Sequence, residues 1–227
     1  REFTANVSHE LKTPLQGIIG SAELIENGLV KQEDLPRFVG HIRREAQRLV
    51  ALIGDIIRLS QLDEGDPLPW ERVDVSALCR DIAADLRDKA EKSQVSLTVE
   101  GQDVQAEGVR RLLHETIYNL CDNAIGYNVP GGSVRVTVSD AGENAVISVA
   151  DTGIGIAPEH QSRIFERFYR VDKNRSRAVG GTGLGLSIVS DTVRRRGGSI
   201  RAQHRQSGSG TVFIVELPLA RREEADE

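Results

Sequence analysis

The sequence lacks methionine altogether and has few aromatic side chains, since Phe, Trp and Tyr make up only 4% of its 227 residues. So few aromatics argue against the base-stacking surfaces of proteins that bind single-stranded nucleic acid. A formal net charge of −5 also argues against a nucleic-acid partner. Because position 1 is not methionine, we expect Arg1 not to be a translation start and an N-terminal portion to be missing.

Long hydrophobic runs and cysteine pairs are scarce as well. No stretch of 18 apolar residues is present, and no secretory signal peptide is visible, so we expect no membrane span in this sequence. The two cysteines, Cys79 and Cys121, have no CxxC spacing, and each lies in an apolar helical pattern. This favours two buried thiols in a reducing compartment over a disulfide or a metal site.

The first 64 residues show helical periodicity. The apolar positions of the second helix are spaced alternately by four and three: Leu35, Val39, Ile42, Ala46, Leu49, Ile53 and Ile56. A similar series precedes them: Val7, Leu11, Leu15, Ile18, Ala22 and Ile25. Asn27-Gly28 interrupts the pattern, so residues 1–64 are predicted to form a helical hairpin. A hairpin alone has too little core, and we expect it to dimerise into a four-helix bundle.

The remainder of the chain has a mixed pattern. Residues 65–74 are rich in turn formers and are predicted to be a linker, and 221–227 to be a disordered tail. Helices are predicted at 75–92, 110–127 and 184–196, and strands at 95–101, 133–140, 145–151, 199–205 and 211–219. This alternation predicts an α/β sandwich over residues 75–220, with a helical layer on a mostly antiparallel sheet.

One glycine-rich stretch follows a predicted strand, and a second precedes a predicted helix. In DTGIGI, Asp151 closes an apolar strand, where its carboxylate could accept a hydrogen bond from an exocyclic amine such as that of adenine. Gly153 and Gly155 would let the backbone approach a flat ligand, although a plain turn explains the same letters. GGTGLGLSIV, residues 180–189, opens into a helix, and free N–H groups at a helix start favour phosphates.

Polar residues also recur along one predicted helix. Glu115, Asn119 and Asn123 are four residues apart and therefore lie on nearly one face. An amphipathic surface helix would explain this spacing. Because two glycine loops follow, amide oxygens facing a nucleotide are an alternative, and these oxygens could bind Mg²⁺ together with phosphates.

Residues 158–179, between the glycine loops, are basic. They are interpreted either as a solvated loop or as a mobile lid whose cations meet phosphates and whose Phe165 and Phe168 anchor it to the core. The cations are Arg167, Arg170, Lys173, Arg175 and Arg177.

Five motifs follow one another along the chain: FTANVSHELKTPL, NLCDNAIGYN, DTGIGI, FERFYR and GTGLGLSIV. In this order they resemble the H, N, G1, F and G2 boxes of the sensor histidine kinases of two-component signalling. The resemblance covers both halves of the chain. It implies a dimerisation and phosphotransfer hairpin followed by an ATP-binding α/β sandwich of the type found in gyrase, Hsp90 and MutL.

The resemblance assigns roles to the opening motif. His9 lies about 200° around the helix from Val7, which directs it to solvent, and it is implied to be the phosphoacceptor. Glu10 is implied to take the ring proton, and Thr13 to orient water for dephosphorylating the partner. Pro14 favours either a functional bend or a static kink.

The resemblance also implies ATP and Mg²⁺ as ligands. The implied nucleotide-binding residues are Asn119, Asn123, Tyr127, Asp151, Gly153, Gly155, Arg170, Gly181, Thr182, Gly183, Leu184 and Gly185. Asn123 matches the Mg²⁺ position, and Asn119 replaces the glutamate base of relatives that hydrolyse ATP, so the pocket is expected to protect ATP from water. Gly126 stands where a lysine is usual. It marks either a simple helix end or a lost phosphate contact, for which Arg170 is the leading substitute.

The implied partners are a second copy, bound through the hairpin, and the receiver domain of a response regulator. The chain is expected to be the cytoplasmic portion of an inner-membrane sensor, with membrane contact only through the missing N-terminal region. Three functions compete: an ATP-dependent protein-histidine kinase, which the motifs favour, a degenerate kinase acting as scaffold or phosphatase, and an ATP-hydrolysing machine.

Overall fold

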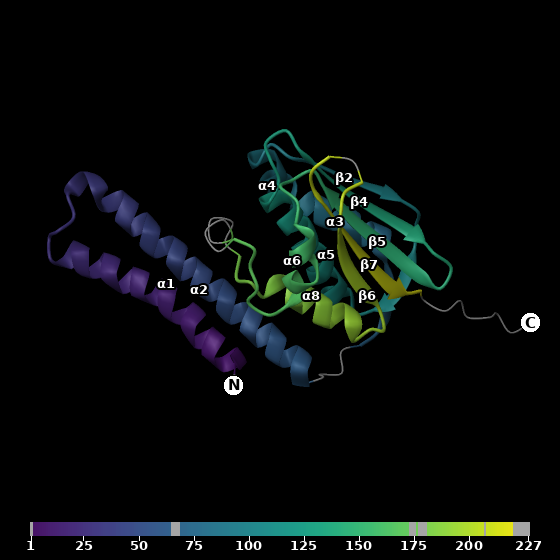
Figure 1. Cartoon of the computed structure of the whole chain (residues 1–227), viewed down its shortest axis with the longest axis horizontal. Helices are drawn as coiled ribbons and strands as arrows, with labels where there is room; N and C mark the ends of the chain where they lie inside the picture. The colour runs from purple at the N-terminus through teal and green to yellow at the C-terminus, as the bar shows by residue number, and fades with distance from the viewer. Residues whose placement is uncertain (1, 65–68, 173–175, 177–180, 207, 220–227) are drawn as a thin grey trace, which may run out of the picture.

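The computed structural model describes residues 2–64, 69–172, 176, 181–206 and 208–219, in a long helical hairpin and an α/β domain (Figure 1). The hairpin comprises α1 (Glu2–Glu26), the short 3₁₀ helix η1 (Gln32–Asp34) and α2 (Leu35–Glu64). The predicted hairpin is therefore confirmed. Gly28 takes φ +67° in the turn, a conformation that glycine adopts without steric strain. The predicted tail, 221–227, lies outside the described residues.

The hairpin leaves much of its apolar surface uncovered. α1 continues through Pro14, whose side chain is buried, so the proline does not end the helix. Large apolar side chains between 40% and 71% exposed are Leu15, Ile19, Leu24, Leu29, Val39, Val50, Ile53 and Ile57. Among the helices that the structure describes, none is long and apolar enough to cross a bilayer.

The α/β domain is built on a five-stranded sheet. Its elements are β1 (Glu71–Asp74), α3 (Val75–Asp85), α4 (Arg87–Lys92), β2 (Ser96–Gly101), β3 (Gln105–Gly108), α5 (Arg110–Gly126), β4 (Ser133–Asp140), β5 (Asn144–Asp151), α6 (Pro158–Gln161), η2 (Arg163–Phe165), α8 (Gly185–Arg194), β6 (Ser199–His204) and β7 (Thr211–Pro218). The strand order is β2-β4-β5-β7-β6, and only the β2–β4 pair is parallel. Helices α3, α5 and α8 cover one face, as the predicted sandwich requires (Figure 1).

The structure corrects two details of the predicted elements. Residues 71–74, expected to belong to the linker, form β1, which pairs with the unpredicted β3. Val73 and Ala106 face each other in this pairing and are both buried, which explains why the segment is ordered into a strand. The helix predicted at 75–92 divides at Leu86 into α3 and α4.

The core explains where the chemistry can lie. Along β5 the side chains alternate, and the inward positions Ala145, Ile147 and Val149 are fully buried. Asp151 is the next inward position, so a carboxylate occupies the last core-facing place of the strand. Cys79 and Cys121 are buried free thiols, as predicted, and burial raises the pKa of Cys79 to about 12.

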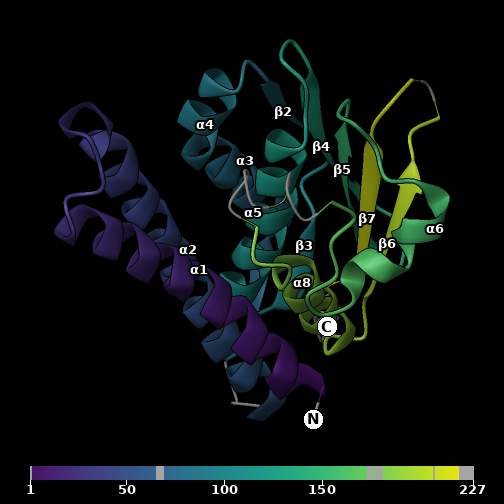
Figure 2. The ribbon, with the colours of Figure 1, turned by 60° about the vertical axis from the view of Figure 1, so that its left-hand side comes forward.

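The two regions meet where α2 packs beside α8 (Figure 2). Leu52 and Leu59 of α2 form a small buried cluster with Leu184 and Ile188, which lie at and just inside the start of α8. Phe3 of α1 lies at the edge of the same cluster. The hairpin thus contacts the segment that was predicted to bind phosphates.

Candidate functional site

Asp151 lies in a buried polar position at the end of β5. Its side chain is 6% exposed, and its Oδ1 accepts hydrogen bonds from the backbone N–H of Gly153 at 2.8 Å and of Thr211 at 3.2 Å. Burial raises the pKa of Asp151 above its ordinary value, while the two backbone hydrogen bonds and the charge of Arg205 act in the opposite direction. Both hydrogen bonds that the described residues donate end on Oδ1, so Oδ2 is the oxygen available to an amine of a ligand.

The glycine after Asp151 keeps this corner closely packed. A Cβ at Gly153 would collide with the carbonyl oxygen of Tyr127, the C-cap residue of α5, and would stand 3.0 Å from Asp151 Oδ1. Gly155 has φ +76°, in the region that side-chain-bearing residues rarely adopt. The end of α5 and the loop after β5 are therefore in contact beside the buried carboxylate.

The second glycine loop lies against the same helix. A Cβ at Gly185 would be 4.0 Å from Asn119 Oδ1, and one at Gly181 would be 3.7 Å from the Tyr127 hydroxyl. Asn123 lies one turn beyond Asn119 on α5, and the side chains of both are partly exposed. The loop after Asp151 and the second glycine loop thus both lie against α5 between Asn119 and the C-cap residue Tyr127, and Asn123 lies between these two in the sequence.

The start of α8 carries hydrogen-bond donors at this corner. α8 begins at Gly185, and the Leu184 N–H donates to the Thr182 hydroxyl at 3.2 Å. Gly183 has φ +80°, and a Cβ there would come within 2.9 Å of Arg170 Nε. A loop of small residues before a ten-residue helix can bind phosphate oxygens through backbone N–H groups and the positive end of the helix dipole.

The oxygen atoms available as metal ligands at this corner fit a nucleotide bound together with Mg²⁺. The described residues contain no group of three or more His, Cys, Asp or Glu side chains arranged to hold a metal. Amide oxygens combined with phosphates suit Mg²⁺, which prefers oxygen ligands and retains part of its hydration shell. Asn119 and Asn123, one turn apart on the α5 face that meets the glycine loop, both carry amide oxygens of this kind.

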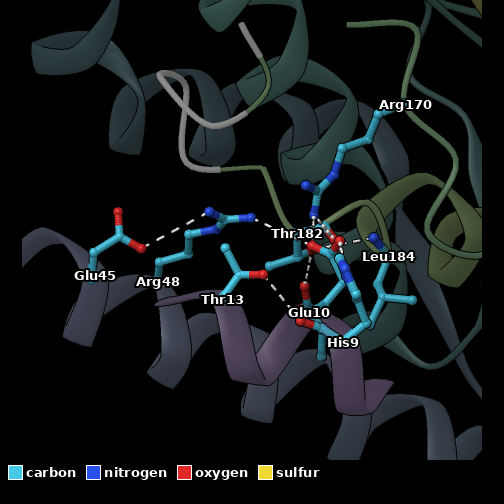
Figure 3. A network of polar contacts seen from close by, with 9 residues as sticks. His9, Glu10, Thr13, Glu45, Arg48, Arg170, Thr182 and Leu184 are labelled. Atoms are coloured by element: carbon cyan, nitrogen blue, oxygen red, sulfur yellow. Dashed lines mark hydrogen bonds and ion pairs between the residues drawn. The ribbon is translucent and has the colours of Figure 1, made fainter. Parts of the chain in front are cut away.

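A second polar cluster, on the hairpin, surrounds His9 (Figure 3). The His9 side chain is 74% exposed, and its Nδ1 lies 3.8 Å from Glu10 Oε1. The Thr13 hydroxyl donates to the His9 carbonyl at 3.2 Å, so it is one helical turn away, as its spacing predicts. The imidazole is therefore accessible to a reactant that approaches from outside the hairpin.

The two oxygens of Glu10 have different neighbours. While Oε1 faces His9, Oε2 lies 3.4 Å from an Arg48 nitrogen of α2 and 2.9 Å from an Arg170 nitrogen of the α/β domain. Arg170 is 4% exposed and also donates to the carbonyl of Thr182 (Figure 3). One arginine therefore connects the carboxylate beside His9 to the second glycine loop.

An open cavity of about 390 Å³ separates His9 from the α/β domain. Its lining comes from α1 and from the segment after η2: Asn6, His9, Glu10, Glu166, Arg167, Phe168, Tyr169 and Arg170. The lining carries two guanidinium groups, of Arg167 and Arg170, and two carboxylates, of Glu10 and Glu166, so the space beside His9 is polar and its formal charges balance.

The predicted lid is held by both regions. Phe165 packs edge-on against Phe213 of the α/β core, with ring centroids 6.4 Å apart. Phe168 contacts Phe3 of the hairpin instead, at 5.8 Å, and its backbone has φ +66°. Arg167 pairs with Asp63 and Asp191. The remaining predicted lid cations, Lys173, Arg175 and Arg177, lie outside the described residues.

Two residues of this arrangement were not predicted from the sequence. Arg48 contacts Glu10, and Asp55 accepts a hydrogen bond from the Thr182 hydroxyl at 2.6 Å. Both lie on α2, where charged residues between apolar positions are typical of any surface helix. Asp55 lies on α2 among Leu52, Ile56 and Leu59, and no pattern in the neighbouring sequence indicates that its partner is Thr182.

The comparisons with known families agree with both regions. Residues 1–65 match the model of the His Kinase A (phospho-acceptor) domain. Residues 108–221 match the model described as histidine kinase-, DNA gyrase B-, and HSP90-like ATPase. The two matches cover the hairpin and most of the α/β domain.

Similar proteins align along nearly the whole chain. The sensor-like histidine kinase SenX3 of Mycolicibacterium smegmatis is 41% identical over 96% of this chain and 57% of its own length. The sensor histidine kinase RppB of a Synechocystis strain is 34% identical over 96% of this chain and 49% of its own length. The chain thus spans about half the length of the curated relatives it matches.

Two solved structures are similar over both regions. Histidine kinase ThkA, in complex with the response regulator protein TrrA, gives a TM-score of 0.79 at 25% identity and covers 96% of this chain and 61% of its own. Full-length ShkA in complex with AMPPNP gives a TM-score of 0.71 at 29% identity and covers 97% of this chain and 46% of its own.

Proposed function

The chain belongs to the sensor histidine kinases of two-component signalling, and we propose that it transfers the γ-phosphoryl group of ATP to its own His9. The phosphoryl group would then pass to an aspartate of a response regulator. The observation that carries the proposal is Arg170, which contacts both Glu10 beside His9 and the Thr182 carbonyl of the glycine loop. The accessible imidazole and the candidate phosphate loop therefore belong to neighbouring surfaces of one molecule.

The proposed nucleotide site uses the corner around Asp151. Asp151 Oδ2 would accept from the exocyclic amine of adenine, a pairing that selects adenine because guanine has a carbonyl at that position. The backbone of residues 181–185 would bind phosphate oxygens, and Asn123 would bind Mg²⁺, which would neutralise phosphate charge. The AMPPNP complex of ShkA supports an adenine nucleotide as the ligand.

The proposed acceptor reaction uses the hairpin side. An exposed neutral imidazole is nucleophilic near neutral pH. Its nitrogen would attack the γ-phosphorus while the bond to the leaving ADP oxygen breaks, and Glu10 Oε1 would take the ring proton. Asn119, whose amide cannot accept a proton from water as a carboxylate does, would limit direct hydrolysis of ATP.

We propose a homodimer and a response regulator as partners. The exposed apolar side chains of the hairpin support dimerisation, because a second hairpin could cover them in a four-helix bundle. The complex of ThkA with TrrA supports a response regulator as the phosphoryl acceptor. The location as the cytoplasmic part of an inner-membrane sensor stays a prediction.

Phosphatase activity toward the response regulator is the finer part of the proposal. Thr13 lies one turn after His9, and its hydroxyl uses its hydrogen for the His9 carbonyl. The lone pairs of that oxygen remain available to a water molecule beside His9. Thr13 would thus position water for attack on a phosphorylated aspartate of the partner.

Incubation with γ-³²P-labelled ATP and Mg²⁺ separates the three functions. A kinase gives label on the protein that is stable to alkali and lost in acid, as expected for phosphohistidine. A scaffold that binds nucleotide gives neither label nor free phosphate. An ATP-hydrolysing machine releases free phosphate without labelling the protein, and either of the last two results would contradict the proposal.

A further inference from the structure

The hairpin places a carboxylate directly on the candidate phosphate loop. Asp55 Oδ2, from the middle of α2, accepts a hydrogen bond from the Thr182 hydroxyl at 2.6 Å. The same hydroxyl oxygen accepts from the Leu184 N–H at 3.2 Å, at the start of α8. Thr182 is therefore fixed between a backbone donor of its own loop and a negative charge from the other region.

The surroundings of Asp55 leave this negative charge incompletely balanced. Arg58 lies 3.7 Å from Asp55 and 4.0 Å from Glu115 of α5, so two carboxylates share one guanidinium. Burial raises the pKa of Asp55, and the charge of Glu115 adds to this rise, while Thr182 and Arg58 oppose it. With both carboxylates ionised, Asp55, Glu115 and Arg58 carry a summed charge of −1, while Arg170, which donates to the Thr182 carbonyl, is paired with Glu10.

We propose that Asp55 is a positioning residue of the nucleotide site: by holding Thr182 and setting a carboxylate against the phosphate loop, it makes docking of the hairpin oppose nucleotide binding. The proposal rests on the proposed function, because it requires residues 181–185 to bind phosphates. It goes further in assigning control of that site to a hairpin residue.

The physical basis is repulsion between like charges at a shared loop. Nucleotide phosphates at the start of α8 would bring further negative charge to the loop that Asp55 contacts, in a partly buried place where screening is weaker than in bulk water. If docking weakens nucleotide binding, nucleotide must weaken docking by the same factor. The nucleotide would then help to release the α/β domain from the hairpin.

Other contacts hold the docked arrangement without placing a negative charge on the loop. Leu52 and Leu59 pack against Leu184 and Ile188. Asp63, also on α2, pairs with Arg167 at 3.4 Å and with Arg195 at 3.9 Å. Asp63 therefore provides a matched control, since it is an aspartate of the same helix that contacts the α/β domain away from residues 181–185.

The test is calorimetric titration of Mg²⁺-ADP into the whole chain and its variants. Asp55→Asn keeps an oxygen that can accept from Thr182 but removes the charge, and Asp55→Ala removes both. We expect both variants to bind Mg²⁺-ADP about fivefold or more tightly than the parent, the lower end of typical coupling between sites. Asp63→Asn should change the affinity less than about twofold, because exposed ion pairs contribute little.

Two further measurements separate electrostatic control from a general loosening of the contact between the hairpin and the α/β domain. The gain of Asp55→Asn should shrink as salt is raised from 50 mM to 500 mM, values chosen to span about a threefold change in Debye length. In self-phosphorylation, the KM for ATP should fall in Asp55→Asn by more than kcat changes.

The inference is overturned if Asp55→Asn binds as the parent does, or if Asp63→Asn tightens binding equally. A parent chain that binds no adenine nucleotide would contradict the proposed function instead, so the two failures are distinguishable. Thermal unfolding of each variant shows whether it is folded, and Asp55→Asn alone decides the matter if Asp55→Ala fails to fold.

Discussion

The helical hairpin and the α/β domain differ in how completely they bury their apolar side chains. Among the described residues of the hairpin, Leu52 and Leu59 are the buried large aliphatic side chains, and both face α8. The α/β domain has a continuous core between its sheet and helices α3, α5 and α8. The α/β domain can therefore hold its own fold, whereas the hairpin gains its cover from other surfaces.

The same difference applies to the two halves of the proposed chemistry. The proposed adenine-binding residues around Asp151 are positioned by elements of the α/β domain, whereas Thr182 of the second glycine loop also contacts Asp55 of the hairpin. The carboxylate beside His9 instead depends on an arginine from each region, Arg48 and Arg170. Changes around Asp151 should therefore act locally, while changes near His9 should depend on how the regions dock.

The largest expected effect comes from a substitution in the hairpin that should leave nucleotide binding intact. Glu10→Gln removes the group proposed to take the His9 proton, and loss of such a group typically slows a reaction by about 10²–10⁴-fold. The initial rate of self-phosphorylation should fall by that factor, while calorimetry should find Mg²⁺-ADP binding within about threefold of the parent. Lys12→Gln, at an exposed position of the same helix, is the control, and a parental rate for Glu10→Gln would remove Glu10 from the reaction.

The matching substitution in the α/β domain should weaken nucleotide binding. In Asp151→Asn the amide oxygen would keep the two backbone hydrogen bonds at Oδ1 and turn the NH₂ group toward the adenine amine. Two facing donors leave a buried group unpaired, at about 1–3 kcal/mol, or roughly tenfold to a hundredfold in affinity. Titration with Mg²⁺-ADP measures the loss, with the exposed Asp103→Asn as the control. Unchanged binding would mean that Asp151 does not contact the ligand.

A third prediction uses pH to sharpen the assignment to Asp151. Because its pKa is raised, Asp151 should take up a proton at a higher pH than an ordinary aspartate, and the protonated form is a poorer acceptor. The contribution of Asp151 to adenine nucleotide affinity should thus be lost as the pH falls from 7 toward 5, so the ratio of the parent's affinity to that of Asp151→Asn should fall over this range. The folding stability due to this group runs the other way, since a raised carboxyl pKa favours the folded state at low pH. The same pH dependence in the parent and in Asp151→Asn would contradict the assignment, because Asp55, whose pKa is also raised, is present in both proteins.

The smallest expected effect concerns Thr13 and again belongs to the hairpin. Thr13→Ala removes one hydroxyl, and alanine is the better helix former, so the fold should survive. Self-phosphorylation and transfer should continue, because His9 and Glu10 remain. Dephosphorylation of the response regulator, followed in the presence of ADP, should slow by about 2–10-fold, the value of one hydrogen bond. Decay as fast as with the parent would leave Thr13 as a helix surface residue.

Much of both regions could be predicted because the controlling patterns are local. The alternation of four and three over residues 35–56 predicted α2, and the apolar run along 145–151 predicted β5 with a carboxylate at its end. The strand β3, Gln105–Gly108, was missed because its letters carry no apolar alternation and its partner β1 lies about 30 residues away.

Contacts between the regions could not be predicted in this way. The pairing of Glu10 with Arg170 joins residues 160 positions apart, and the bond from Thr182 to Asp55 joins residues 127 positions apart. Such contacts depend on how two surfaces dock, which periodicity along one helix does not specify. The backbone of Phe168 likewise could not be predicted from the sequence. Its φ of +66° is uncommon for a bulky residue, and its ring contacts Phe3 of the hairpin.

Mapping the phosphorylated residue tests the central claim most directly. The parent and His9→Gln would be incubated with γ-³²P-labelled ATP and Mg²⁺ under alkaline quenching, with the label located by mass spectrometry of peptides. The account predicts acid-labile label on His9 in the parent, and no label but parental Mg²⁺-ADP binding in His9→Gln. Label on another of the five histidines, or full labelling of His9→Gln, would contradict it.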